Sequence, residues 1–96
     1  MTEILLIADK YSLKIIEDTA QSFGTVYDEK FLGTIGDVGC FSFFPTKTLG
    51  AYGDGGAIVT DNKRVAERAR MLKNHGASRK YYNELIGYNS RLDSIQ

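Results

Sequence analysis

The length and the charge of the chain limit what it can be. Ninety-six residues are enough for one small domain and too few for two. Because twelve basic residues balance twelve acidic ones, no net charge attracts nucleic acid or an anionic membrane surface. The composition, 43% hydrophobic and 25% charged, is that of a globular chain and excludes disorder and collagen-like repeats.

Two further features indicate a cytoplasmic protein. No apolar run reaches the length of a membrane span, and the first residues lack the basic region, apolar stretch and cleavage site of a secretion signal. The single cysteine, Cys40, has no disulfide partner and lies within an apolar run, so we expect a buried, reduced thiol. The sequence therefore predicts a cytoplasmic chain without a membrane or nucleic-acid partner.

The first third of the chain predicts a helix, a strand and an irregular segment. Apolar residues recur at helical spacing over residues 3–11, with Thr2 as the N-cap. Residues 14–17 form a short apolar run that suits a strand flanked by helices, and this run ends in Glu17 and Asp18. Residues 24–36 mix three glycines with aromatic and charged residues, which favours a loop or a small hairpin.

Two strands and a helix follow. The strands are predicted at residues 38–44 and 56–60, and the link between them is too short for a helical crossover. The later strand therefore either runs antiparallel to the earlier one or lies further off in the sheet. A helix over residues 62–74 has Asp61 or Asn62 as its N-cap and Gly76 as its stop.

The outer face of that helix is expected to carry its charges, and the tail is polar. We interpret the basic residues of the helix as a solvated face, because no aromatic residues alternate with them as in a nucleic-acid site. They are Lys63, Arg64, Arg68, Arg70 and Lys73, with Glu67 among them. Residues 77–96 are polar and rich in tyrosine, and residues 91–96 begin to look helical.

A lysine follows the central predicted strand. The apolar run ends at Pro45, which cannot donate to a sheet, and Lys47 opens a glycine-rich loop. The ends of strands carry the chemistry of α/β proteins. An amine that aromatic neighbours shield from water is more often neutral, and it then attacks a carbonyl carbon to form a Schiff base. Most loop lysines are only solvated side chains, so the neighbouring residues must decide whether Lys47 is a reactive amine.

Other polar residues stand at the ends of predicted strands or in loops. They are Asp18 with Gln21, Ser42 with Lys47, and Asn89. Taken singly, each has a common structural explanation as a turn former, a cap or a strand residue bonded to backbone.

Taken together, four stretches resemble the DegT/StrS family of sugar aminotransferases, enzymes that depend on pyridoxal phosphate (PLP). The stretches are I-I-E-D-T-A-Q-S-F-G, G-D-V-G-C-F-S-F-F-P-T-K-T-L-G-A-Y-G-D-G-G-A-I-V-T, N-H-G and G-Y-N-S-R-L-D-S-I-Q. The resemblance implies an α/β fold, a three-layer fragment of the large domain of the aspartate aminotransferase fold (fold type I) with about three core strands and flanking helices. Residues 1–96 would be a single partial domain without its N-terminal part and without the C-terminal small domain.

The resemblance also implies a role for each polar residue. Lys47 would bond covalently to the cofactor's aldehyde, and Asp18 would pair with the pyridine nitrogen. Gln21 would pack beside the ring, and Ser42 would bind the phosphate. Asn89 would reach a phosphate in a neighbouring subunit of a homodimer. These roles agree with the chemistry, since the ring withdraws electrons only while its nitrogen keeps a proton, which a carboxylate holds in place. A freed lysine amine can then carry a proton as base and acid.

The implied reaction moves an amino group from an amino acid, with glutamate as the expected donor, to a keto nucleotide-sugar. We expect the 96 residues alone to be inactive, because the walls that position a substrate are absent. Two alternatives stay open. One is a non-catalytic folding or interaction module, whose exposed apolar surface predicts self-association. The other is a PLP-dependent sugar dehydratase of the same family, although such relatives replace the lysine and Lys47 is present.

Overall fold

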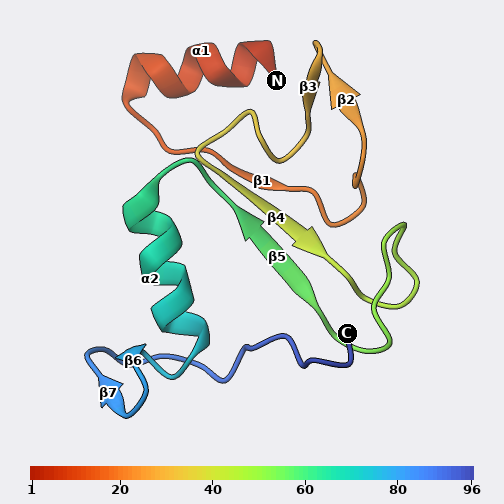
Figure 1. The fold of residues 1–96 in the computed structure, drawn as a ribbon. Coiled ribbons are helices and arrows are strands. Elements are labelled where there is room, and N and C mark those ends of the chain that lie inside the picture. Colours follow the sequence, from red (N-terminus) through yellow and green to blue (C-terminus); the bar gives the residue numbers. More distant parts are fainter.

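A three-stranded sheet holds the middle of the chain together. The computed structural model describes all 96 residues, and its elements follow one another as α1 (Thr2–Tyr11), β1 (Ile16–Asp18), β2 (Val26–Tyr27), β3 (Lys30–Phe31), β4 (Val38–Ser42), β5 (Gly56–Val59), α2 (Lys63–Lys73), β6 (Ala77–Arg79) and β7 (Tyr82–Asn83) (Figure 1). The sheet has the order β1-β4-β5. The predicted α/β class, three core strands and flanking helices are therefore confirmed.

The two pairs of neighbouring strands differ in direction. β1 and β4 run parallel, with Asp18 opposite Cys40, and the long connection between them allows this. β4 and β5 run antiparallel, with Ser42 opposite Gly56. Of the two arrangements that the sequence left open for the last strand, the antiparallel one is therefore correct.

β1 begins two residues later than predicted because a neighbouring side chain holds the residues before it. The Asp37 carboxylate accepts hydrogen bonds from the Lys14 ammonium at 2.8 Å and from the backbone N–H of Ile15 at 2.9 Å. β4 ends at Ser42, two residues earlier than predicted. The chain beyond it turns at Pro45 into the following loop.

Both predicted helices are present, but only one of them has the expected cap. Thr2 is the first residue of α1 and not its N-cap, and its hydroxyl lies 3.2 Å from the Tyr27 hydroxyl. Asn62 caps α2, since its side-chain oxygen accepts the N–H groups of Arg64 and Val65. Gly76, with φ +74°, stops that helix as predicted and donates to the carbonyl of Met71 at 2.8 Å.

The hairpin allowed for residues 24–36 is confirmed, whereas the tail differs from its prediction. β2 and β3 pair antiparallel around a turn with positive φ at Asp28 and Glu29. In the tail, β6 and β7 form a second, unpredicted hairpin, and residues 91–96 are not helical. The segment before them is extended because the N–H groups of Tyr88 and Ser90 bond the last carbonyls of α2.

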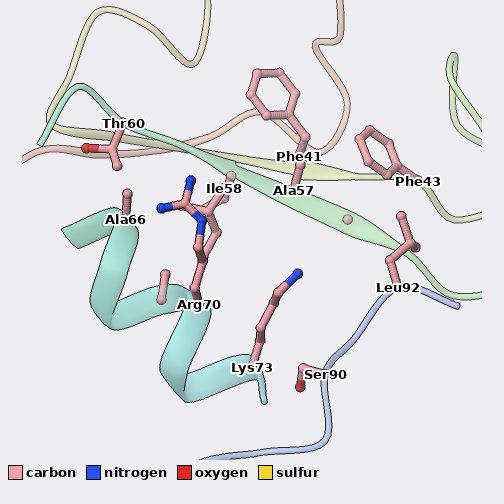
Figure 2. A pocket seen from close by; sticks show the side chains of 13 residues that line it. Phe41, Phe43, Ala57, Ile58, Thr60, Ala66, Arg70, Lys73, Ser90 and Leu92 are labelled. Carbon is pink, nitrogen blue, oxygen red and sulfur yellow. The ribbon is translucent and has the colours of Figure 1, made fainter. Parts of the chain in front are cut away.

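The sheet is the middle of three layers, and its two faces are covered unequally. Residues 19–36 lie on the face that carries Phe41, whose ring meets the Phe23 ring edge-on at 5.9 Å between centroids. α2 lies across the other face, toward which Ile58 points (Figure 2). On that second face the side chains of Ile16 and Ile58 stay 69% and 56% exposed. One face is therefore packed and the other is largely open.

The molecule as a whole is flat and has little interior. It measures 44 × 33 × 16 Å, and its radius of gyration of 15.2 Å exceeds the roughly 12.5 Å of a compact domain of this length. Its accessible surface is 7714 Å², against about 5500 Å² for a folded monomer of this mass. Ala8 is the only buried hydrophobic residue, and Cys40 is only half-buried, contrary to expectation. No helix is long and apolar enough to cross a membrane.

Candidate functional site

Two of the predicted site residues end neighbouring parallel strands. Asp18 is the last residue of β1, and Ser42 is the last residue of β4. Because Asp18 lies opposite Cys40 and side chains alternate along a strand, Asp18, Cys40 and Ser42 share one face of the sheet. Ligands of α/β sheets bind outside the carboxyl ends of the parallel strands. The structure thus brings Asp18 and Ser42 to the edge where a cofactor would bind.

One oxygen of the Asp18 carboxylate has no hydrogen-bond partner. One oxygen, Oδ1, accepts the N–H of Ala20 at 3.1 Å, and the other has no hydrogen-bond partner in the chain. The next residue, Thr19, is buried, and its N–H and hydroxyl donate to the Cys40 carbonyl at 2.9 and 2.7 Å. These two bonds of Thr19 fix the end of β1 against β4. The second oxygen of the Asp18 carboxylate stays exposed and can accept a hydrogen bond.

Lys47 is held in a tight loop directly after β4. Its backbone N–H donates to the Phe44 carbonyl at 2.8 Å, which closes a turn around Pro45. The loop then folds back so closely that a Cβ at Gly50 would lie 2.6 Å from the Pro45 carbonyl oxygen. The half-buried Lys47 forms no salt bridge. In the same loop, Ser42 accepts the Phe44 N–H at 3.2 Å, and its hydroxyl proton remains free to be donated.

The other two predicted residues lie outside the helices and strands. Gln21 is exposed in the turn after Thr19 and makes no hydrogen bond. Asn89 lies in the tail, where its side-chain oxygen accepts from the Arg91 guanidinium at 3.2 Å. Asn89 also lines a hollow of about 340 Å³ together with Gly56, the residue opposite Ser42 in the sheet. Of the five predicted residues, the sheet thus brings Asp18 and Ser42 together, whereas Gln21, Lys47 and Asn89 lie in the segments that follow β1, β4 and β7.

A hollow beside these residues has none of the five in its lining. It has a volume of about 600 Å³ and lies between α2, the open face of the sheet and the tail (Figure 2). Arg70 and Lys73 point into it, although the sequence placed both on the solvated face of the helix. Val65 and Leu72 line a separate hollow on α2. The strand ends, and not the hollow beneath α2, define the candidate site.

The sequence did not single out one buried carboxylate beside the site. Glu17 is 7% exposed and accepts the N–H groups of Gly33, Ile35 and Gly36 at 2.8, 2.8 and 2.7 Å. Burial opposes its ionisation, but these three donors outweigh burial and hold the pKa of Glu17 below its ordinary value. The available signal was strand alternation, which places the residue before Asp18 on the packed face, where a charge needs partners.

The whole chain matches known sugar aminotransferases. The family model of the DegT/DnrJ/EryC1/StrS aminotransferase family covers residues 1–96. The dTDP-3-amino-3,6-dideoxy-alpha-D-galactopyranose transaminase of Aneurinibacillus thermoaerophilus is 53% identical over 96 residues, which are 100% of this chain and 26% of that protein.

Solved structures agree with this match. A DegT DnrJ EryC1 StrS aminotransferase from Brucella abortus superposes with a TM-score of 0.92 at 46% identity, covering 99% of this chain and 26% of that one. NtdA from Bacillus subtilis, solved with bound cofactor PMP, gives a TM-score of 0.87 at 35% identity over 99% of this chain and 22% of that one. The chain spans about a quarter of the length of the curated relatives that it matches. It belongs to the DegT/DnrJ/EryC1/StrS aminotransferase family.

Proposed function

We propose that the chain is the central part of the large domain of a PLP-dependent nucleotide-sugar aminotransferase. In this function an amino acid donates the amino group, and a keto nucleotide-sugar accepts it. Relatives named as UDP- and dTDP-sugar aminotransferases support the substrate class. Residues 1–96 are a partial domain in this proposal, which the open face of the sheet and the large accessible surface support.

One observation carries the proposal. Asp18 and Ser42 end adjacent parallel strands on one face of the sheet, and the loop that holds Lys47 starts directly after β4. A carboxylate and a hydroxyl donor thus lie at one strand edge, and the residue with the amine follows in the next loop. These are the groups that a protonated pyridine nitrogen, a phosphate and an aldehyde require.

The groups at this edge have the bonding capacity that PLP needs. The free oxygen of Asp18 can accept the ring N–H, and the Ser42 hydroxyl can donate to a phosphate oxygen. Lys47 has no carboxylate partner that would hold its amine elsewhere. Bound PLP would supply an electron sink for the carbon that loses its proton.

Each residue of the chain then has a defined task. The Asp18 carboxylate would keep the ring nitrogen of PLP protonated, and Ser42 would bind the phosphate. The Lys47 amine would bind the aldehyde carbon and, when free, would take and return a proton. Gln21 would pack beside the ring, and the Asn89 amide would reach the phosphate in a second copy, so the complete site would belong to a dimer. The 96 residues alone bind PLP without turning over a sugar, because the remaining walls of the site are missing.

Covalent trapping tests the proposal. The chain is incubated with PLP, reduced with borohydride, digested and mapped by mass spectrometry. We expect the label on the peptide that contains Lys47. Lys47→Arg should abolish this label, and Lys73→Arg, a matched change in the large hollow, should leave it unchanged. A wild-type chain that carries no label on Lys47 at saturating PLP contradicts the proposal.

A further inference from the structure

Glu17 is a buried carboxylate that the proposed reaction does not use. It is 7% exposed, and it accepts three backbone N–H groups from one short segment, residues 33–36. A carboxylate with this many donors is strongly held, since charge-assisted bonds are about twice as strong as neutral ones. We call Glu17 with the N–H groups of Gly33, Ile35 and Gly36 the carboxylate clasp.

The segment that forms the clasp packs directly against β4. Gly33 has φ +89°, and a Cβ there would overlap the Phe41 ring. A Cβ at Gly39, the residue opposite Glu17 in the sheet, would overlap the Gly33 backbone. Glu17 is therefore bonded to a segment that is itself in close contact with the neighbouring strand.

The clasp acts on β1, a short strand at the edge of the sheet, and adds to the bonds that hold its two ends. This strand has three residues and pairs on one side only, with β4. Since side chains alternate, a slip of one residue would move Asp18 from its own face to the packed face. Glu17 at the centre of the strand occupies the packed position that Asp18 would then enter.

We propose that Glu17 is a positioning residue, whose carboxylate, held by the N–H groups of Gly33, Ile35 and Gly36, fixes the face of the sheet on which the Asp18 carboxylate lies. Glu17 does not touch the cofactor in this role. The consequence for cofactor binding rests on the proposed function, whereas the placement of Asp18 is a property of the fold and is tested separately.

Amide NMR shifts test the placement without any cofactor. The Ala20 N–H is bonded to the Asp18 carboxylate, so its chemical shift reports whether that hydrogen bond is in place. The N–H shifts of residues 33, 35 and 36 report on Glu17 in the same way. In Glu17→Gln we expect the Ala20 N–H shift to leave its wild-type value, because the new NH₂ group faces a backbone donor and no longer fixes β1. The control Asp37→Asn removes a carboxylate that also accepts a backbone N–H beside β1, and it should leave the Ala20 N–H shift unchanged.

A double-mutant cycle tests the consequence for the cofactor. We expect Glu17→Gln to reduce PLP labelling of Lys47 about tenfold, as loss of a supporting residue does in other sites. If Glu17 acts through Asp18, then Glu17→Gln should add little to the loss caused by Asp18→Asn. Independent, additive losses would overturn the positioning role. Asp37→Asn should label like the wild type.

The outcomes separate the two proposals. If the wild-type Lys47 takes no label, the proposed function fails, and the Ala20 N–H shift still decides whether Glu17 positions Asp18. If Lys47 is labelled but the Ala20 N–H shift in Glu17→Gln equals that of the wild type, the positioning role is wrong and the proposed function stands. Should Glu17→Gln not fold, Glu17→Asp keeps the charge on a shorter side chain and must show a smaller change of the Ala20 shift and a partial loss of labelling. An unchanged Ala20 N–H shift and unchanged labelling in Glu17→Asp would then overturn the role.

Discussion

The two faces of the central sheet show different degrees of completeness. On the face of Glu17, Gly39 and Phe41, residues 33–36 pack closely, and a buried carboxylate accepts three N–H groups from them. On the face of Ile16 and Ile58, α2 spans a hollow of about 600 Å³ and leaves both isoleucines more than half exposed. The contacts of the packed face come from residues of this chain. The open face, which also carries Asp18, Cys40 and Ser42, leaves apolar side chains in contact with solvent.

The comparison predicts that added volume is least tolerated on the packed face. Gly39→Ala places a methyl group against the Gly33 backbone, which no rotamer change relieves. We expect a loss of about 3 kcal/mol in the free energy of unfolding, measured by urea denaturation. Gly53→Ala is the control, because its added Cβ lies 3.4 Å from its nearest neighbour, the flexible Gln96 side chain. Equal stability of the two variants would mean that the packed face is loose.

Removing volume should also distinguish the faces. Phe41→Ala takes away a half-buried ring in contact with Phe23 and should cost about 2 kcal/mol. Ile58→Ala removes an exposed side chain and should change stability by less than about 0.5 kcal/mol. The same denaturation measurement checks both. A larger loss from Ile58→Ala than from Phe41→Ala would reverse the assignment of the faces.

Acid should act on the packed face through Glu17. Because its pKa in the folded chain lies below its ordinary value, its ionised form stabilises the fold. This contribution is complete above the ordinary pKa of a glutamate, about 4.3, and is lost as the pH falls through the lower value of the folded chain. Glu17→Gln should cost about 1 kcal/mol at neutral pH and weaken the acid dependence of the unfolding free energy.

Asp37 provides a second carboxylate with which the acid dependence of the unfolding free energy can be compared. Hydrogen bonds from Lys14 and from the Ile15 N–H lower the pKa of Asp37, so its contribution has the same sign. Asp37→Asn should therefore remove another part of the acid dependence. If Glu17→Gln keeps the full acid dependence of the wild type, Glu17 is not held by its three donors.

The smallest effect on stability, and the clearest on association, is expected from the open face. Exposed apolar side chains of this kind drive self-association. Light scattering should show species larger than a monomer at high concentration, and the double variant Ile16→Ser, Ile58→Ser should reduce them while keeping the circular dichroism spectrum. A wild-type chain that remains monomeric at high concentration would contradict the prediction that the open face drives self-association.

Local patterns predicted most of the elements, because helices and strands depend on periodicity and caps that are visible in the sequence. Asn62, Gly76 and the apolar run before Pro45 are examples. The predicted element bounds were wrong where residues far apart in the sequence form hydrogen bonds with each other. Asp37 takes the Ile15 N–H and shifts the start of β1, and the tail is extended because it bonds the last carbonyls of α2.

The candidate site was only partly predictable for the same reason. Asp18, Ser42 and Lys47 stand next to strand ends that the sequence reveals, and the resemblance supplied their roles. Glu17 needed the fold, because its donors lie sixteen to nineteen residues away along the chain. The direction of Arg70 and Lys73 also depended on how α2 crosses the sheet, which helical periodicity alone does not give.

A crystal structure of the chain soaked with PLP tests the central claim most directly. The account predicts the cofactor's aldehyde carbon bonded to Lys47 Nζ, its ring nitrogen within hydrogen-bond distance of the free Asp18 oxygen, and its phosphate at the Ser42 hydroxyl. Cofactor bound in the hollow of Arg70 and Lys73, with none at the ends of β1 and β4, would contradict it.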